Sequence, residues 1–326
     1  MPIFSFMSPK KLWRVIRRSF NDFWSSNVLK LSASLAFSTI FSLPGLLIII
    51  IWCSNFFYRR EVIEGSLYNQ LSKFIGKNAA DAVQQAMQNA PHTGTTHIAT
   101  IVGFAALLIG ATSVFGEIQD SINLLWRLKA KPRKGKGWLR LIINRLLSFS
   151  MIISLGFILL VSLVINGAME LLLNRLLQNF PEITVVIVYI VNTILTFFIT
   201  AIIFGLIFKV LPDAKIEWRH VSVGAFTTAV FFMIGRFLIS YYLGQSTFSS
   251  AYGAAGSTII FLLWAYYSSM ILYFGAAFTR EYAIENGSQI YPNQYAVWVE
   301  QVEVVSKQPL PETTDAQQAK SEEIVK

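Results

Sequence analysis

The sequence predicts an all-α integral membrane protein with about six transmembrane helices. Apolar residues make up 54% of the 326 residues and charged residues only 14%, whereas soluble domains carry roughly 25% charged residues. Four stretches contain no Asp, Glu, Lys or Arg, namely residues 31–58, 146–169, 183–208 and 237–279. Each is longer than the ~20 residues that a helix needs to cross a bilayer. This composition excludes a soluble globular domain, a disordered chain and a disulfide scaffold.

The expected spans follow from apolar length and from the polar breaks between apolar stretches. We place them at residues 31–52, 98–115 (continuing as helix to about 126), 139–167, 183–211, 221–243 and 257–279. They form a membrane domain over residues 31–280, which follows an N-terminal segment at 1–30. The polar tail at 281–326 is expected to be disordered. An even number of spans puts both termini on one side of the membrane.

The distribution of basic residues predicts which side that is. Residues 1–30, 127–145 and 209–219 together with Arg280 hold eighteen Lys and Arg, and the opposite face of the predicted topology holds five. The positive-inside rule therefore predicts that both termini are cytoplasmic. We interpret the net charge of +9 as an orientation signal at anionic lipid headgroups and not as a nucleic-acid interface.

Residues 9–26 form an amphipathic pattern. At 100° per residue, an apolar face stands opposite a basic one, with Leu12, Trp13, Ile16, Phe20, Phe23 and Trp24 against Lys10, Lys11, Arg14, Arg17, Arg18 and Asn21. Aromatic residues on one side and basic residues on the other are typical of an interfacial helix that lies in the headgroup plane. The alternative is a cytosolic helix packed on the protein.

Residues 59–97 form the largest predicted extracytoplasmic segment. Apolar residues recur with helical spacing over 63–75 and again over 79–86, and Gly76 separates the two stretches. We expect two short amphipathic helices that rest on the outer surface or cap a cavity.

Several sequence blocks resemble a known family. They are LAFST (35–39), GATSVF (110–115), EIQDSIN (117–123), KVLPD (209–213) and SAYGAAGS (250–257). Their order and sequence are similar to the YihY/BrkB family of bacterial inner-membrane proteins, which older annotation labelled ribonuclease BN. The resemblance covers about residues 10–285 and implies a six-span, multi-pass protein of the bacterial inner (plasma) membrane, without a settled activity. Family members often have Glu where this chain has Ala277, so no role for that carboxylate carries over.

A polar stripe lies at the cytoplasmic end of the second predicted span. Within about 100° of the helix circumference fall Gly110, Ser113, Glu117, Asp120, Leu124 and Arg127. Ionisable residues inside spans are costly, so they are candidate functional residues. Two interpretations stay open. The stripe binds a cation or proton or lines a gate, or it is a structural network in which the acids pair with Arg145, Arg219 or Arg280.

Two further polar residues lie inside predicted spans. Arg236 is 15 residues into the fifth span, about 22 Å along a helix and therefore in the outer half of the bilayer. It either pairs or snorkels to the outer interface, or it contacts an anionic headgroup or solute. Asn192 of the fourth span is a candidate member of the same polar network, although buried amides more often join helices than bind ligands.

The connection at residues 244–256 has no charged residue and is rich in small and hydroxyl side chains. Non-helical backbone is tolerated at membrane depth where protein or a water-filled cavity covers it. We therefore expect an outer-mouth loop that tucks inward, with candidate residues Ser250, Tyr252, Gly253 and Gly256.

The sequence supplies little for enzymatic chemistry. The predicted topology places His92 and His97 outside and His220 inside, Cys53 is the single cysteine, and no GxxxxGK[ST] loop occurs. We expect no enzyme activity, no cofactor and no resident metal. The favoured hypothesis is a transporter-like protein that moves a lipid or a small anionic or amphipathic solute, or exchanges an ion, without ATP hydrolysis. The alternative is a non-transporting membrane factor that supports envelope assembly or integrity. Expected partners are anionic lipid headgroups at the cytoplasmic face and an unidentified cargo, and a homo-oligomer is compatible with the sequence.

Overall fold

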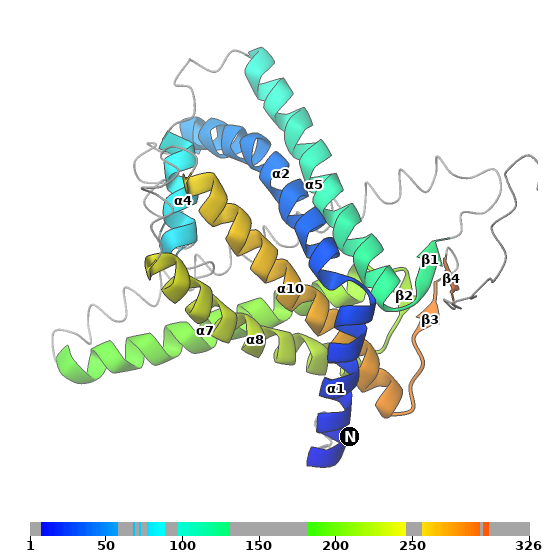
Figure 1. The fold of residues 1–326 in the computed structure, drawn as a ribbon. Helices are drawn as coiled ribbons and strands as arrows, with labels where there is room; N and C mark the ends of the chain where they lie inside the picture. Colours follow the sequence, from blue (N-terminus) through cyan, green and yellow to red (C-terminus); the bar gives the residue numbers. More distant parts are fainter. Residues whose placement is uncertain are drawn as a thin grey trace, which may run out of the picture.

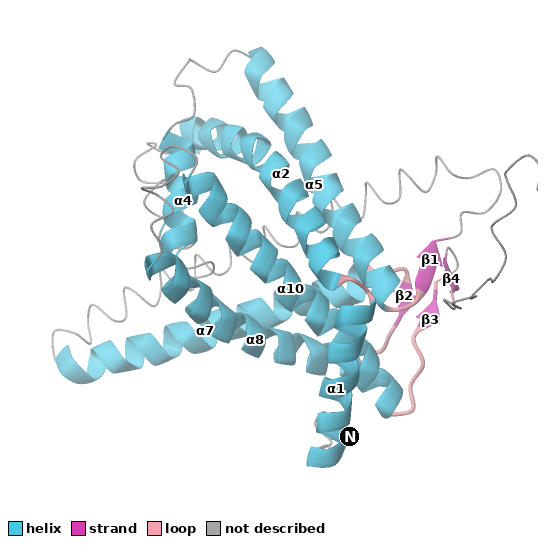
Figure 2. Ribbon diagram, viewed as in Figure 1, coloured by secondary structure: helices cyan, strands magenta, loops and turns pink. Residues whose placement is uncertain are grey.

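The computed structural model describes residues 8–57, 68, 72, 77–88, 97–130, 181–245, 256–293 and 296–299. This part of the chain is mostly helical (Figures 1 and 2). Its helices are α1 (Pro9–Ser25), α2 (Val28–Phe57), α4 (Lys77–Gln88), α5 (His97–Leu125), α7 (Pro181–Val210), α8 (Trp218–Gln245) and α10 (Gly256–Glu285). Its strands are β1 (Leu128–Ala130), β2 (Ala214–Lys215), β3 (Tyr291–Pro292) and β4 (Ala296–Trp298).

Three helical stretches in the described residues are long and apolar enough to cross a membrane. They are Ile190–Val210, Trp218–Leu243 and Gly256–Glu285, and Val28–Ser42 is a shorter apolar stretch. The three long stretches correspond to the last three spans predicted from the sequence. Helices α2 and α5 cover the first two predicted spans, and the predicted span at 139–167 lies outside the described residues.

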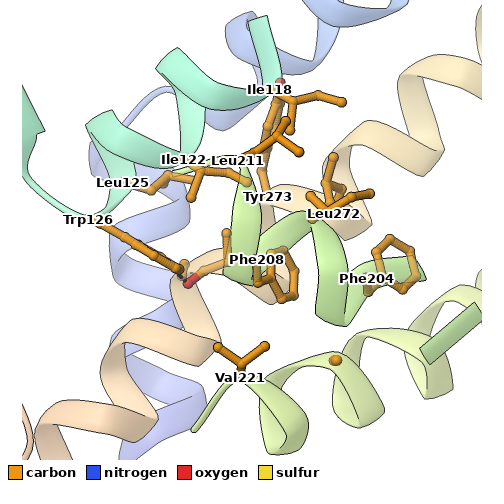
Figure 3. Packing of buried hydrophobic residues seen from close by; sticks show 14 of the residues in the cluster. Ile118, Ile122, Leu125, Trp126, Phe204, Phe208, Leu211, Val221, Leu272 and Tyr273 are labelled. Carbon is orange, nitrogen blue, oxygen red and sulfur yellow. Dashed lines mark hydrogen bonds between the residues drawn. The ribbon is translucent and has the colours of Figure 1, made fainter. Parts of the chain in front are cut away.

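Helix α10 is the centre of the packing, because it contacts α1, α2, α4, α5 and α8 (Figure 1). The main apolar core forms where the C-terminal halves of α5 and α7 meet α10 (Figure 3). Ile122, Phe208 and Tyr273 are fully buried there. Trp126 is also buried, and its indole Nε1 donates a hydrogen bond of 2.9 Å to the carbonyl of Ala276 in α10. Trp126 therefore joins the end of α5 to α10 in two ways, through the apolar surface that its ring buries and through the hydrogen bond that its N–H donates.

Helices α8 and α10 cross at two Gly–Thr contacts. A Cβ atom on Gly224 would collide with Thr279, and one on Gly275 would collide with Thr228. Each threonine hydroxyl donates a 2.7 Å hydrogen bond to the carbonyl four residues before it, Thr228 to Gly224 and Thr279 to Gly275. Small residues let helix backbones approach closely in membranes, so the absence of a side chain at Gly224 and Gly275 permits this crossing.

Helix α1 packs on the protein through one side. Val15, Ser19 and Phe23 are buried, and Val15 packs on Phe278 and Tyr282 of α10. Phe23, which was predicted on the apolar face of this helix, is thus one of the residues through which it packs. Four other large side chains on α1 remain exposed by 42–68%, namely Leu12, Trp13, Phe20 and Trp24. Helix α1 therefore packs on the protein and still presents an aromatic surface.

Helix α4 covers the second of the two amphipathic helices expected in 59–97. Its buried side chains Ala79, Ala82 and Val83 fit the predicted spacing, and α4 packs on α10 and α8. Tyr68 lies beside it, and a hydrogen bond with Asp81 raises the pKa of the Tyr68 phenol. The first expected helix lies outside the described residues except for two isolated positions.

The chain after residue 281 differs from the expected disordered tail. Helix α10 continues to Glu285 and ends in a Schellman motif, in which Gly287 has φ +75° and Ser288 N–H bonds to the Ala283 carbonyl at 3.0 Å. Strand β4 then pairs with β1, and β3 pairs with β2, both antiparallel. Strands of two or three residues leave no periodic pattern in a sequence, so this part was missed. Residues 300–326 lie outside the described part.

Both ends of the described chain lie at one end of the molecule, which we call the strand end. It contains the C-terminal ends of α5 and α10 and the N-terminal end of α8, together with the four strands (Figure 1). Helix α1 is tied to it, because Arg14 and Arg18 form ion pairs of 2.7 and 3.2 Å with Glu285. Helix α4 lies at the opposite end, beside the start of α10 (Figure 1).

Candidate functional site

A cavity of about 750 Å³ lies at the strand end, where the turn between α1 and α2 faces the last turns of α5. We call it the α5 cavity. It is lined by Asp22, Ser25, Ser26, Asn27, Asp120, Asn123, Leu124, Leu125, Arg127, Leu128, Lys129 and Val299. Sites for small molecules typically have volumes of about 300–1,000 Å³, so the α5 cavity is large enough for a solute or a lipid headgroup.

The α5 cavity carries charges of both signs. Asp22 and Asp120 supply carboxylates, and Arg127 and Lys129 supply cations. Arg280 already pairs with Asp22, because its Nη1 donates to Asp22 Oδ2 at 2.8 Å, and the same nitrogen donates to Glu281 at 2.7 Å. The lining therefore holds two carboxylates and two cations, and Arg280 divides its interaction between Asp22 and Glu281. With charges of both signs, the cavity suits a zwitterionic guest, or an anionic one that contacts Arg127 and Lys129, better than an apolar one.

Two residues of the lining have an unusual backbone conformation. Asn27 has φ 52° and Arg127 has φ 57°, and they are the only non-glycine residues with positive φ in the described ranges. Asn tolerates this left-handed region, but Arg seldom adopts it. Arg127 follows the last turn of α5, and its carbonyl accepts a 2.9 Å hydrogen bond from Val299 N–H. These contacts hold Arg127 in the left-handed conformation. Such conformations persist where the surroundings fix them, and they cluster at functional sites.

A reciprocal pair of hydrogen bonds fixes one wall of the α5 cavity. Asn123 Nδ2 donates to Asp213 Oδ2 at 3.0 Å, and Asp213 N–H donates to Asn123 Oδ1 at 2.9 Å. Both residues are buried. The pair joins the end of α5 to the connection between α7 and α8, and the Asp213 carbonyl accepts a bond from Asn293 N–H in the C-terminal segment. We call this pair the Asn–Asp clamp.

The polar stripe predicted on α5 is divided into two parts by the structure. Its first part packs on α2, because a Cβ on Gly110 would collide with Ser42, and Ser113 Oγ lies 3.5 Å from Ser38 Oγ. Its last part, Asp120, Leu124 and Arg127, lines the α5 cavity. Glu117 is half-buried between the two parts. Asp120, Leu124 and Arg127 of the predicted stripe therefore share one site, and Gly110, Ser113 and Glu117 do not line it.

The remaining predicted residues lie elsewhere. Asn192 is in α7 and Arg236 is in α8, both half-buried, and neither lines the α5 cavity. Gly256 is the buried first residue of α10, so it belongs to a helix and not to the expected loop. Ser250, Tyr252 and Gly253 lie outside the described residues.

The sequence interpretation missed four residues of this site. Asn123 and Asp213 stand in the EIQDSIN and KVLPD blocks, and a polar residue in each block was the available signal. Lys129 was counted only as an orientation charge. Asp22 gave no signal, because only the packing of α1 on α10 brings it to Arg280. Within the described residues, no group of three or more His, Cys, Asp or Glu side chains is placed to hold a metal ion.

Comparison with known proteins places this chain in a family. The family described as "Virulence factor BrkB" matches residues 19–296. This range includes both residues of the Asn–Asp clamp and every helix above except the first half of α1. The chain belongs to the BrkB family. This confirms the resemblance carried by the sequence blocks.

Relatives that are similar to this chain are described as UPF0761 membrane proteins. The UPF0761 membrane protein of Chromobacterium violaceum is 26% identical over 77% of this chain and 58% of its own length. Those of Vibrio vulnificus and Tolumonas auensis are each 24% identical, over 75% and 78% of this chain and 74% and 81% of their own lengths. The chain spans less than three fifths of the Chromobacterium violaceum relative. No solved structure matches the chain. The molecule is thus a membrane protein of the BrkB family, and its activity has to be inferred from its own site.

Proposed function

We propose that this BrkB-family chain is a six-span, transporter-like protein of the bacterial inner membrane. The α5 cavity is its cargo-binding site on the cytoplasmic side. The observation that carries the proposal is a polar cavity with charged groups of both signs at the end of apolar helices. Its cargo is an anionic or zwitterionic solute or lipid headgroup. Transport proceeds without ATP hydrolysis, and the chain is not an enzyme.

The connectivity supports six spans with both termini in the cytoplasm. Helices α5 and α7 both end at the strand end, and the interval between residues 130 and 181 separates them in the sequence (Figure 1). The uncharged stretch 146–169 lies in that interval and has the length for one crossing. Basic residues gather at the strand end, which the positive-inside rule places in the cytoplasm. The exposed aromatic side chains of α1 then lie at the inner headgroup layer.

Access to the α5 cavity can be tested with a single cysteine. In a Cys53→Ser background, Asp120→Cys is expected to react with a membrane-impermeant maleimide in inside-out vesicles and not in sealed cells, since Asp120 is exposed at the strand end. Ala276→Cys, at a fully buried position, is the control that should stay unlabelled in both. Labelling of Asp120→Cys from the outside alone would reverse the proposed orientation.

Transport can be tested in proteoliposomes with two probes, a fluorescent phosphatidylglycerol and a fluorescent organic anion. Arg127→Gly removes the guanidinium while keeping a residue that accepts φ 57°. We expect it to reduce flux of the transported probe by about tenfold or more, because a charge-assisted hydrogen bond is worth roughly 1.5–3 kcal/mol.

The matched control for this experiment is Arg17→Gly, which removes an exposed arginine of α1 that lies outside the cavity lining. It also introduces a helix glycine, so both proteins are compared at equal folded amounts. Unchanged flux in Arg127→Gly would exclude the α5 cavity as the route. Absence of flux for both probes in the folded wild-type protein would favour the non-transporting envelope factor.

A further inference from the structure

A second pocket lies at the strand end and shares no lining residue with the α5 cavity. It has a volume of about 580 Å³ and lies where α7 ends, β2 and β3 pair, and α8 begins. Its charged lining residues are Lys209, Lys215 and Glu217, and its other polar lining residues are His220, Ser288, Gln289 and Tyr291. We call it the α8 pocket.

Cationic groups dominate this pocket. Lys209 donates from Nζ to the Ile216 carbonyl, and the same ammonium lies 5.7 Å from the centroid of the Trp218 ring. These contacts fix the ammonium at the pocket while using one of its three donor hydrogens. Lys215 adds an exposed ammonium from β2, and Glu217 is the single acidic residue of the lining.

One buried polar atom in the lining has no hydrogen-bond partner in the part of the chain that the structure describes. His220 is only 2% exposed, and its Nδ1 lacks a hydrogen-bond partner among the described residues. Its backbone N–H donates a 3.1 Å hydrogen bond to the Glu217 carbonyl, and its ring packs on Tyr282 with the ring centroids 6.0 Å apart. An unsatisfied buried polar atom costs about 1–3 kcal/mol, and an ion or ligand that is bound to it removes this cost.

The first turn of α8 adds a partial positive charge. His220 lies in this turn of a 28-residue helix, and helix N-termini favour anions. Trp218 and Tyr291, which are 55% and 54% exposed, flank the pocket. Exposed aromatic residues at the ends of spans are typical of the headgroup layer, and basic pockets between spans on the cytoplasmic side bind phosphate-bearing lipids.

We infer that the α8 pocket binds a phosphate group through Lys209, Lys215 and His220. The phosphate belongs to the headgroup of an anionic phospholipid or to free phosphate, and both sources offer the same oxygen atoms to the two ammonium groups and the imidazole. This binding does not depend on transport through the α5 cavity, because the two linings are separate.

The test measures binding to the purified full-length protein in detergent. Inorganic phosphate is titrated by equilibrium dialysis, and phosphatidylglycerol and phosphatidylcholine are compared by native mass spectrometry. Binding of phosphate assigns the free anion. Binding of phosphatidylglycerol alone, in preference to phosphatidylcholine, assigns the lipid headgroup. Lys215→Gln and His220→Leu are each expected to lower the affinity for the probe that binds by about tenfold.

Arg219→Gln is the matched control, because it removes an exposed positive charge next to His220 but outside the lining. It should retain binding within about twofold. If His220→Leu does not fold, Lys215→Gln on the exposed strand still decides the outcome. The inference is overturned if neither phosphate nor phosphatidylglycerol binds, if binding survives in Lys215→Gln, or if Arg219→Gln weakens binding equally.

Discussion

Gly275→Ala is expected to lower the free energy of unfolding by about 1–3 kcal/mol, the usual cost of forcing extra atoms into a packed interface. The new methyl group would collide with Thr228 of α8. In an open helix the same change is favourable by about 1 kcal/mol, because alanine is a better helix former than glycine. The measurement is thermal unfolding of the purified protein in detergent.

Gly116 provides the matched control for this prediction. It also lies inside a long helix, α5, but a Cβ atom there meets no other atom within 4 Å. Gly116→Ala should therefore leave the unfolding temperature unchanged or raise it. Adding Thr228→Ala to Gly275→Ala removes the two nearest colliding atoms and should recover part of the loss. Equal unfolding temperatures for the Gly275 and Gly116 variants would mean that α8 and α10 do not cross at this distance.

Asn123→Asp is expected to destabilise the fold by about 2–3 kcal/mol. The change replaces the donor Nδ2, which lies 3.0 Å from Asp213 Oδ2, by a second carboxylate oxygen. Two carboxylates at this distance repel each other in a buried site. The expected result is a lower unfolding temperature and a lower yield of folded protein.

The exchange of the two residues distinguishes the clamp from a general effect of residue 123. In Asn123→Asp with Asp213→Asn, the amide on residue 213 donates to the new carboxylate, which still accepts from the backbone N–H of residue 213. The double variant should recover most of the stability, and Asp213→Asn alone should cost less than Asn123→Asp. Additive losses in the double variant would contradict the clamp geometry.

The membrane helices could be predicted from the sequence because hydrocarbon imposes strict conditions on length and polarity. Helices α7, α8 and α10 each coincide with a predicted span, at 183–211, 221–243 and 257–279, to within about six residues at either end. The strands could not be predicted in this way. Strand β1 pairs with β4 from a distant part of the chain, and neither strand exceeds three residues.

The candidate site was predictable only in part. Asp120 and Arg127 were found because charged residues on an apolar helix are costly, and this cost is visible in a single helix. Asn123 and Asp213 were not found, because their pairing spans 90 positions and depends on how α5 meets the connection after α7. The helical wheel also could not separate Gly110, which packs on α2, from Asp120, because both lie on one face of α5.

The central position of α10 has a consequence for biogenesis. Its partners α1, α2, α4, α5 and α8 all precede it in the chain, so they leave the ribosome before the helix on which they pack. More than 200 residues separate the starts of α2 and α10, and at about 5–20 residues per second their translation takes on the order of 10–45 s. During that interval α1 and α2 are inserted without α10, which is when a membrane chaperone or quality-control protease would find them incompletely assembled.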